Sequence, residues 1–207
     1  MKKMFLFLMV IMLGVNAFAQ GTELTGDSRT EIVSKIEKAH KQLTSLSATF
    51  TQEKKSSLFT DKVVQKGKLQ YKSPKQLRWE YTSPTVTTVI FNNGKVSLKN
   101  ANGKVSAPNK MLNEMGSMII NTINGNFLKD NADFKARYYK NGKGEVTVVL
   151  APINKKIKSF YKNITIVLNA STLLADKVIM NEANGDVTTI DFASKKTNVA
   201  LSDSLFK

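Results

Sequence analysis

The feature that most restricts the fold of this chain is a two-residue alternation of apolar and polar side chains. It begins at Ala48 and continues, with one interruption, almost to the C-terminus. This period places one face of a β-strand in a core and the other face in water. The alternating runs cover residues 48–52, 69–71, 77–81, 146–150, 160–168, 178–180 and 190–192. With the segments between them, they predict about ten strands.

Asparagine-glycine pairs separate several of these runs. They occur at Asn93-Gly94, Asn102-Gly103, Asn141-Gly142 and Asn184-Gly185. Because such pairs favour the tight turns of hairpins, we expect successive strands to pair antiparallel. Sequential hairpins on this scale curl into a barrel or a half-barrel. The pattern therefore predicts an α+β fold built on a curved antiparallel sheet.

Two segments have helical spacing instead. Ser28 and Glu31 form a capping-box pattern, and apolar residues then recur at helical spacing to about Leu46. A second amphipathic helix is predicted over residues 109–123, ending near Asn124-Gly125. Its apolar residues include Met111, Leu112, Met115, Met118 and Ile119. Methionine adapts to variable partners, but base rates by themselves favour the simpler role of filling a core beneath the sheet.

The first nineteen residues are interpreted as a secretory signal peptide. Lys2 and Lys3 precede a short apolar run, and Ala17-Phe18-Ala19 resembles a cleavage site. Cleavage after Ala19 would leave residues 20–207 as a single domain, exported to the periplasm. No linker or internal repeat divides that domain.

Composition excludes several classes of function. The chain has no cysteine and one histidine, so cysteine-ligated metals and cysteine nucleophiles are excluded, and we expect no metal site. Its sixteen acidic residues are scattered, and phosphate-binding and hydrolase motifs are missing. We therefore expect no enzyme and no cofactor. His40 is interpreted as a residue at the boundary of the apolar helix face.

The formal net charge of +15 suggests an acidic partner. Lysines are spread along nearly every strand and turn, and export would remove the chain from most nucleic acid. We therefore expect contact with anionic lipid headgroups or with an acidic protein partner in preference to nucleic acid. The alternative is a lysine-rich surface that only keeps the protein in solution. Two helices and outward-facing lysines argue against a membrane-spanning barrel.

A resemblance to a known family rests on an ordered series of residues. Ala48-x-Phe50-x-Gln52 is followed by Gly67-x-Leu69 and then by Pro74-Lys75-Gln76-Leu77-Arg78-Trp79-Glu80-Tyr81. Further matches are Pro84, Asn93-Gly94-Lys95 and the segment 185–192. In this order the chain resembles the periplasmic carriers of outer-membrane lipoproteins, the LolA family. The resemblance spans nearly all of residues 20–207.

The resemblance implies an incomplete β-barrel, with the helices acting as a lid over an apolar cavity. It also implies a monomer that takes acylated lipoproteins from an inner-membrane releasing complex to an outer-membrane acceptor. We expect the acyl-chain cavity to be lined by Phe50, Leu69, Tyr71, Leu77, Trp79, Tyr81, Met111, Leu112, Met115, Met118, Ile119, Ile166 and Leu168.

One departure from the family pattern is Ser73. Members of the better-known branch have arginine immediately before the proline of this strand, where it tethers the lid. Ser73 therefore predicts a lid held mainly by apolar contacts. The alternative function is a divergent carrier or sensor of another lipid or amphiphile.

Overall fold

The computed structural model describes residues 21–103, 105–106, 110–126 and 128–207, and the side chains of residues 105–106, 110–115 and 118 lie outside the description. The strands are β1 (Thr22–Leu24), β2 (Ser45–Lys55), β3 (Lys62–Lys72), β4 (Gln76–Ser83), β5 (Thr87–Asn92), β6 (Lys95–Asn100), β7 (Val105–Ser106), β8 (Phe134–Lys140), β9 (Val146–Pro152), β10 (Tyr161–Leu168), β11 (Ala175–Glu182) and β12 (Val187–Thr197). The helices are α1 (Gly26–Lys41), α2 (Lys110–Ile123), α3 (Lys155–Lys158) and a 3₁₀ turn, η1 (Asp203–Phe206).

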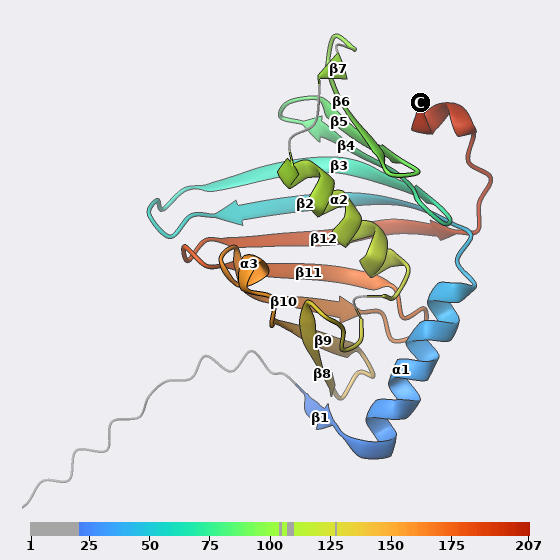
Figure 1. The fold of residues 1–207 in the computed structure, drawn as a ribbon, viewed down its shortest axis with the longest axis vertical. Coiled ribbons are helices and arrows are strands. Elements are labelled where there is room, and N and C mark those ends of the chain that lie inside the picture. The colour runs from blue at the N-terminus through green and yellow to red at the C-terminus, as the bar shows by residue number, and fades with distance from the viewer. Residues whose placement is uncertain (1–20, 104, 107–109, 127) are drawn as a thin grey trace, which may run out of the picture.

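The described strands form one antiparallel sheet in the order β1-β8-β9-β10-β11-β12-β2-β3-β4-β5-β6-β7. The last long strand, β12, pairs with the first long strand, β2, so both chain halves meet at the centre. The outer strands β1 and β7 pair with β8 and β6, and not with each other. The predicted curved, incomplete antiparallel barrel is confirmed (Figure 1).

The sheet has twelve strands within the described residues, where the sequence predicted about ten. The two outermost strands are short, because β1 has three residues and β7 has two. Runs of that length are too short for an alternation to be recognised. The short helix α3 was also missed, and Phe160 follows this helix as an exposed residue instead of facing inward from a strand.

The predicted bounds of the first helix were wrong at both ends. The helix begins at Gly26 after Thr25, and Ser28 lies within its first turn, where its hydroxyl donates to the Thr25 carbonyl. Glu31 forms an ion pair with Lys35 and no capping box. Leu46 belongs to β2, because the chain has already turned into the sheet by Ser45.

The predicted second helix is confirmed, with α2 ending at Ile123. Its C-terminus is a Schellman motif, in which the Asn126 N–H donates to the Asn121 carbonyl at 2.8 Å and the Gly125 N–H donates to the Thr122 carbonyl. Gly125 has φ of +75°, a conformation that glycine adopts without steric cost. Figure 1 shows α2 lying across the central strands of the sheet.

Two apolar clusters cover the inward face of the sheet. One joins α1, through Ile36, to strands β8–β11. The other joins strands β2–β5 to α2, through Ile119, Ile120 and Ile123. No helix of the described residues is long and apolar enough to cross a membrane.

Candidate functional site

An apolar cavity lies between the two clusters, under the C-terminal half of α2. Its volume is about 130 Å³. Strands from both halves of the sheet contribute to its wall, so the curvature of the sheet creates the space. The wall consists of His40, Leu46, Ala48, Gln52, Leu69, Trp79, Tyr81, Ile119, Thr122, Ile123, Leu128, Phe134, Leu150, Tyr161, Ile164, Ile166, Leu168, Leu174, Ala175, Val178, Met180, Ile190, Phe192 and Lys195.

The residues expected at an acyl-chain cavity fall into three groups. Those that lie on the cavity wall are Leu69, Trp79, Tyr81, Ile119, Ile166 and Leu168. Those that are buried in the adjoining core, outside the wall, are Phe50, Tyr71 and Leu77. The side chains of Met111, Leu112, Met115 and Met118 lie outside the described residues.

Phe50 and Tyr71 support the site from outside the wall. The ring centroid of Phe50 lies 4.2 Å from that of Trp79, and the rings of Trp79 and Phe192 meet edge to face at 6.2 Å. Tyr71 donates a hydrogen bond from its hydroxyl to the side chain of Asn124, directly after α2. Phe50 therefore positions an aromatic wall residue, and Tyr71 fixes the end of the helix.

Sequence reasoning missed the part of the wall that comes from β8, β9 and β11. Phe134, Leu150, Val178 and Met180 are examples, and they come from the same inward-facing alternation as Ile166. The phase of that alternation would have identified them as inward-facing. It would not have placed them opposite Trp79, because that relationship depends on how far the sheet curls.

His40 connects three segments at one end of the cavity. It is buried in α1, and its Nδ1 lies 2.6 Å from the Ile123 carbonyl oxygen at the end of α2. Its Nε2 lies 3.1 Å from the carbonyl oxygen of Leu173, in the turn between β10 and β11. His40, which was predicted to lie at the boundary of the apolar helix face, therefore links α1 to the end of α2 and positions it.

The C-terminal end of α2 is also fixed by Asn124, whose side-chain amide donates to the Pro74 carbonyl at 3.2 Å. This contact lies beside Ser73, the position of the departure from the family pattern. Hydrogen bonds at Tyr71, Asn124 and His40 thus hold this end of the helix. The expectation of a mainly apolar latch overlooked them, because they join residues far apart in the sequence.

A β-bulge turns a lysine toward the cavity. The register of β12 against β2 shifts between Ala193 and Lys196, and Ser194 has φ of +52°. Lys195 therefore faces inward, where its ammonium donates to the Ala175 carbonyl at 3.0 Å and pairs with the Asp176 carboxylate. Bulges often redirect a side chain in this way beside functional sites.

The opposite end of the cavity carries hydroxyl and amide groups. Tyr81 donates from its hydroxyl to the side-chain oxygen of Gln52 at 3.1 Å. Burial raises the pKa of both Tyr81 and Tyr161, so these phenols remain neutral at physiological pH. Among the described residues, no three acidic or histidine side chains are grouped to hold a metal ion.

Solved structures share the fold at low sequence identity. An uncharacterized conserved protein from Thermus thermophilus matches with a TM-score of 0.53 and 11% identity, over 86% of this chain and 92% of that one. A chain of the MucA/MucB complex of Pseudomonas aeruginosa matches with a TM-score of 0.50 and 12% identity, over 86% and 60%. A LolA superfamily protein from Nitrosomonas europaea gives 0.46 and 12%, over 86% and 96%.

No curated protein matches the chain. The family model described as "Outer membrane lipoprotein carrier protein LolA" matches residues 41–207. The match covers the sheet from β2 to β12, α2 and therefore most of the cavity wall. The open antiparallel barrel with a helix across its apolar face agrees with this assignment. The chain is a member of the LolA outer membrane lipoprotein carrier family.

Proposed function

We propose that the protein is a periplasmic carrier that holds the acyl chains of lipoproteins in the cavity beneath α2. It takes its cargo from an inner-membrane releasing complex and gives it to an outer-membrane acceptor. The observation that carries the proposal is an apolar space enclosed by both halves of the sheet. Family membership supports the same class, since LolA-like proteins are lipid- or lipoprotein-binding carriers and not enzymes.

The energy of exposing an acyl chain explains the need for such a cavity. Each methylene group left in water costs about 0.8 kcal/mol relative to an apolar environment. The wall offers aliphatic side chains such as Leu69, Ile166 and Val178, with few polar groups. Transfer between membranes therefore requires the chain to be covered throughout, and the cavity provides that cover.

The volume of the cavity implies that α2 moves during loading. Pockets that enclose drug-sized ligands have volumes of about 300–1,000 Å³, whereas this one has about 130 Å³. An entire acyl chain thus requires a wider space than this conformation offers. The hydrogen bonds at Asn124 and His40 hold the C-terminal end of α2, so opening pivots on that end.

Trp79 supplies a polar group suited to an acylated cargo. Its indole Nε1 is buried and makes no hydrogen bond of good geometry among the described residues, with the Tyr81 side chain as its polar neighbour. A buried donor without a partner is costly, whereas the ester or amide carbonyl of a lipidated cysteine could accept its hydrogen bond. Trp79→Phe should therefore weaken binding of an acyl ester more than binding of a plain alkyl chain.

A cavity-filling substitution provides the direct test. The protein, freed of bound lipid, should bind a fluorescent fatty acid and a synthetic triacylated lipopeptide saturably. Val178→Phe, which adds bulk to the wall, should abolish binding while the protein stays folded. Val63→Phe is the matched control, because Val63 is 58% exposed on β3. Equal binding by both variants would contradict the assignment of the site.

The alternative is a carrier or sensor of another lipid or amphiphile. Native mass spectrometry of protein released from its own periplasm would identify the mass of the co-purified cargo. A carrier should also deliver the lipopeptide to acceptor vesicles, whereas a sensor would bind it without delivery. The protein mass in the same spectrum tests the predicted signal peptide, since cleavage after Ala19 gives a chain that starts at Gln20.

A further inference from the structure

The exposed large apolar side chains of the described residues gather at one end of the sheet. They are Leu58, Phe59, Val63, Val64, Val86, Ile153 and Phe160. Antiparallel strands alternate in direction, so the β2–β3, β4–β5, β9–β10 and β11–β12 connections all emerge at this end. We call these four connections, residues 56–61, 84–86, 153–160 and 183–186, the loop end of the protein.

Leu58 and Phe59 are the most exposed of these residues, at 84% and 70%. They are consecutive residues of the β2–β3 connection, and this hairpin projects beyond the neighbouring strands in Figure 1. Single exposed apolar residues are ordinary on a protein surface. Several collected at one end, with none at the other among the described residues, indicate an interaction site.

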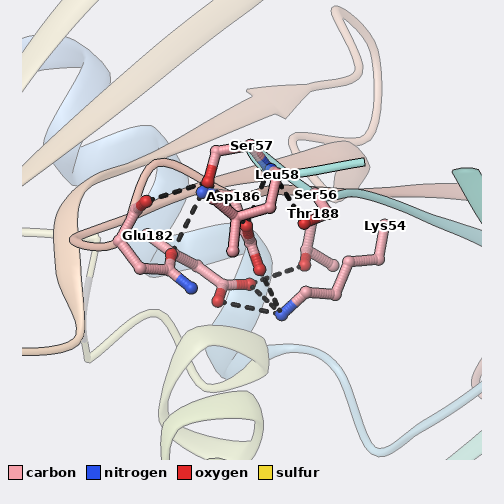
Figure 2. Close-up of polar contacts among 8 residues, drawn as sticks. Lys54, Ser56, Ser57, Leu58, Glu182, Asp186 and Thr188 are labelled. Atoms are coloured by element: carbon pink, nitrogen blue, oxygen red, sulfur yellow. Dashed lines mark hydrogen bonds and ion pairs between the residues drawn. The ribbon is translucent and has the colours of Figure 1, made fainter. Parts of the chain in front are cut away.

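Polar contacts hold this hairpin tip in place, as Figure 2 shows. The Ser57 N–H donates to the Asp186 carboxylate at 2.9 Å, and the Ser57 hydroxyl donates to the Asn184 carbonyl at 3.0 Å. The Lys54 ammonium lies 3.0 Å from Glu182 and 3.3 Å from Asp186. These contacts hold the β2–β3 connection against the β11–β12 turn, and Leu58 and Phe59 project from that connection.

A second apolar projection lies beside the first. The Ala183 N–H, next to the same β11–β12 turn, donates to the Phe160 carbonyl at 2.9 Å. Phe160 is 51% exposed and directly follows α3. Because both projections contact one turn, the β2–β3 tip and the α3 region form a continuous surface.

Lysines surround these apolar side chains. The exposed ones near the two projections are Lys55, Lys62, Lys155, Lys156, Lys158 and Lys162. The acids of this region are largely engaged with lysines: Glu53 pairs with Lys62, and both Glu182 and Asp186 pair with Lys54. Asp61 is a further exposed acid at the tip, and the Asp133 carboxylate accepts from the Asn154 side chain in the β9–β10 connection. The surface is thus apolar at its projections and basic around them.

We propose that the loop end docks on the surface of a bilayer that contains anionic lipid. Leu58, Phe59 and Phe160 enter the boundary between headgroups and acyl chains, and the lysines contact headgroup phosphates. Apolar projections within a basic surround are the pattern of peripheral membrane attachment. The projections come from separate connections, which suits a broad surface better than a narrow groove in a protein.

Docking in this way would bring one end of the cavity to the lipid. Gln52, Tyr81 and Tyr161 line the cavity and lie within a few residues of the loop end on β2, β4 and β10. An acyl chain could then pass between membrane and cavity without crossing open water. This consequence rests on the proposed carrier function, whereas docking itself can be measured without any cargo.

The test is cosedimentation of residues 20–207 with vesicles. These residues include the whole described fold, and the apolar leader would itself bind lipid. One set of vesicles contains phosphatidylglycerol and phosphatidylethanolamine, and the other contains phosphatidylcholine alone. We expect binding to the first set only, weaker at high salt, and reduced about tenfold or more by Leu58→Ser combined with Phe59→Ser.

A matched pair of charge reversals tests the orientation. Lys155→Glu with Lys158→Glu acts at the loop end, whereas Lys75→Glu with Lys95→Glu makes the same charge change at exposed sites of the opposite end. Only the first pair should abolish vesicle binding. Equal loss of vesicle binding in both double variants would mean that anionic vesicles attract any basic face of the protein, and it would overturn the proposal. Vesicle binding that persists in the Leu58→Ser, Phe59→Ser variant would also overturn the proposal. So would a result in which the unaltered protein binds no vesicles and the variant loses delivery of cargo to an acceptor protein. Solution binding of a fluorescent fatty acid, measured in parallel, reports separately on the carrier function.

Discussion

Gly116 of α2 lies so close to Phe91 of β5 that a Cβ atom at position 116 would overlap the phenyl ring. Phe91 is only 3% exposed, so its ring cannot move outward into solvent. The absence of a side chain at one helix position therefore sets how closely α2 approaches the sheet, and with it the depth of the cavity beneath the helix.

Gly116→Ala should lift α2 from the sheet. Overpacking of a core costs about 1–3 kcal/mol, against a gain of about 1 kcal/mol from the better helix propensity of alanine. We expect a small net loss of stability in urea denaturation and faster exchange of a bound fluorescent lipid. Gly142→Ala is the control, since a Cβ there meets nothing within 4 Å.

A smaller residue at position 91 should rescue this variant. Phe91→Leu in the Gly116→Ala background removes the ring that the new methyl group would overlap. Restored exchange kinetics would place the effect at this contact. Unchanged kinetics in both variants would show that the approach of α2 does not control access to the cavity.

His40→Leu should loosen the C-terminal end of α2. The substitution removes the partner of the Ile123 and Leu173 carbonyls within a buried site. Leaving a buried carbonyl without its donor costs about 1–3 kcal/mol. We expect a lower urea midpoint and stronger hydrogen exchange at residues 119–125. Protection of α2 equal to that of the unaltered protein would exclude His40 as its tether.

Asp186 should make stability depend on acid pH. The hydrogen bond from the Ser57 N–H, with the neighbouring Lys54, lowers the pKa of the Asp186 carboxyl from 3.8 to about 2. A lowered pKa in the folded state stabilises the fold above pH 3.8, and this stabilisation is lost as pH falls toward 2. The stability difference between the protein and its Asp186→Asn variant should therefore shrink across that window. Urea denaturation at pH 5, 4, 3 and 2 measures it, and a constant difference would contradict the assigned pKa.

Asp176→Asn should leave the Lys195 ammonium at the cavity wall without its carboxylate partner. The Lys195–Asp176 pair is partly buried, so its loss should cost about 1 kcal/mol. Without the carboxylate, Lys195 should favour a fatty-acid anion over the matching fatty alcohol. Lys195→Met in the Asp176→Asn background should remove this preference, since it takes away the remaining charge of the pair. Competition binding of the acid and the alcohol in both variants provides the measurement.

Local patterns predicted most of the fold. The alternation around Phe50 and Trp79 and the turn at Asn93-Gly94, where both residues have positive φ, correspond to strands and a hairpin in the structure. The end of α2 followed from Asn124-Gly125. These features are decided by side-chain period and turn chemistry within a few residues, which is why sequence alone predicts them.

The site was harder to predict because it depends on long-range geometry. Strict alternation from Ile190 and Phe192 would point Lys195 outward, and the bulge at Ser194 reverses it. Similarly, the contacts of His40 with Ile123 and Leu173 join segments separated by 83 and 133 positions. No local pattern carries such information, since it arises only when the sheet curls.

The free edges of the open barrel have a consequence for assembly. An unpaired strand presents backbone donors and acceptors to which another chain can add. Here the outermost strands, β1 and β7, have only three and two residues. An open sheet would normally risk pairing with other copies along its edges, and these two short strands offer a neighbouring molecule few backbone groups to extend. Short outer strands of this kind therefore give an open sheet few backbone groups for pairing with a second copy.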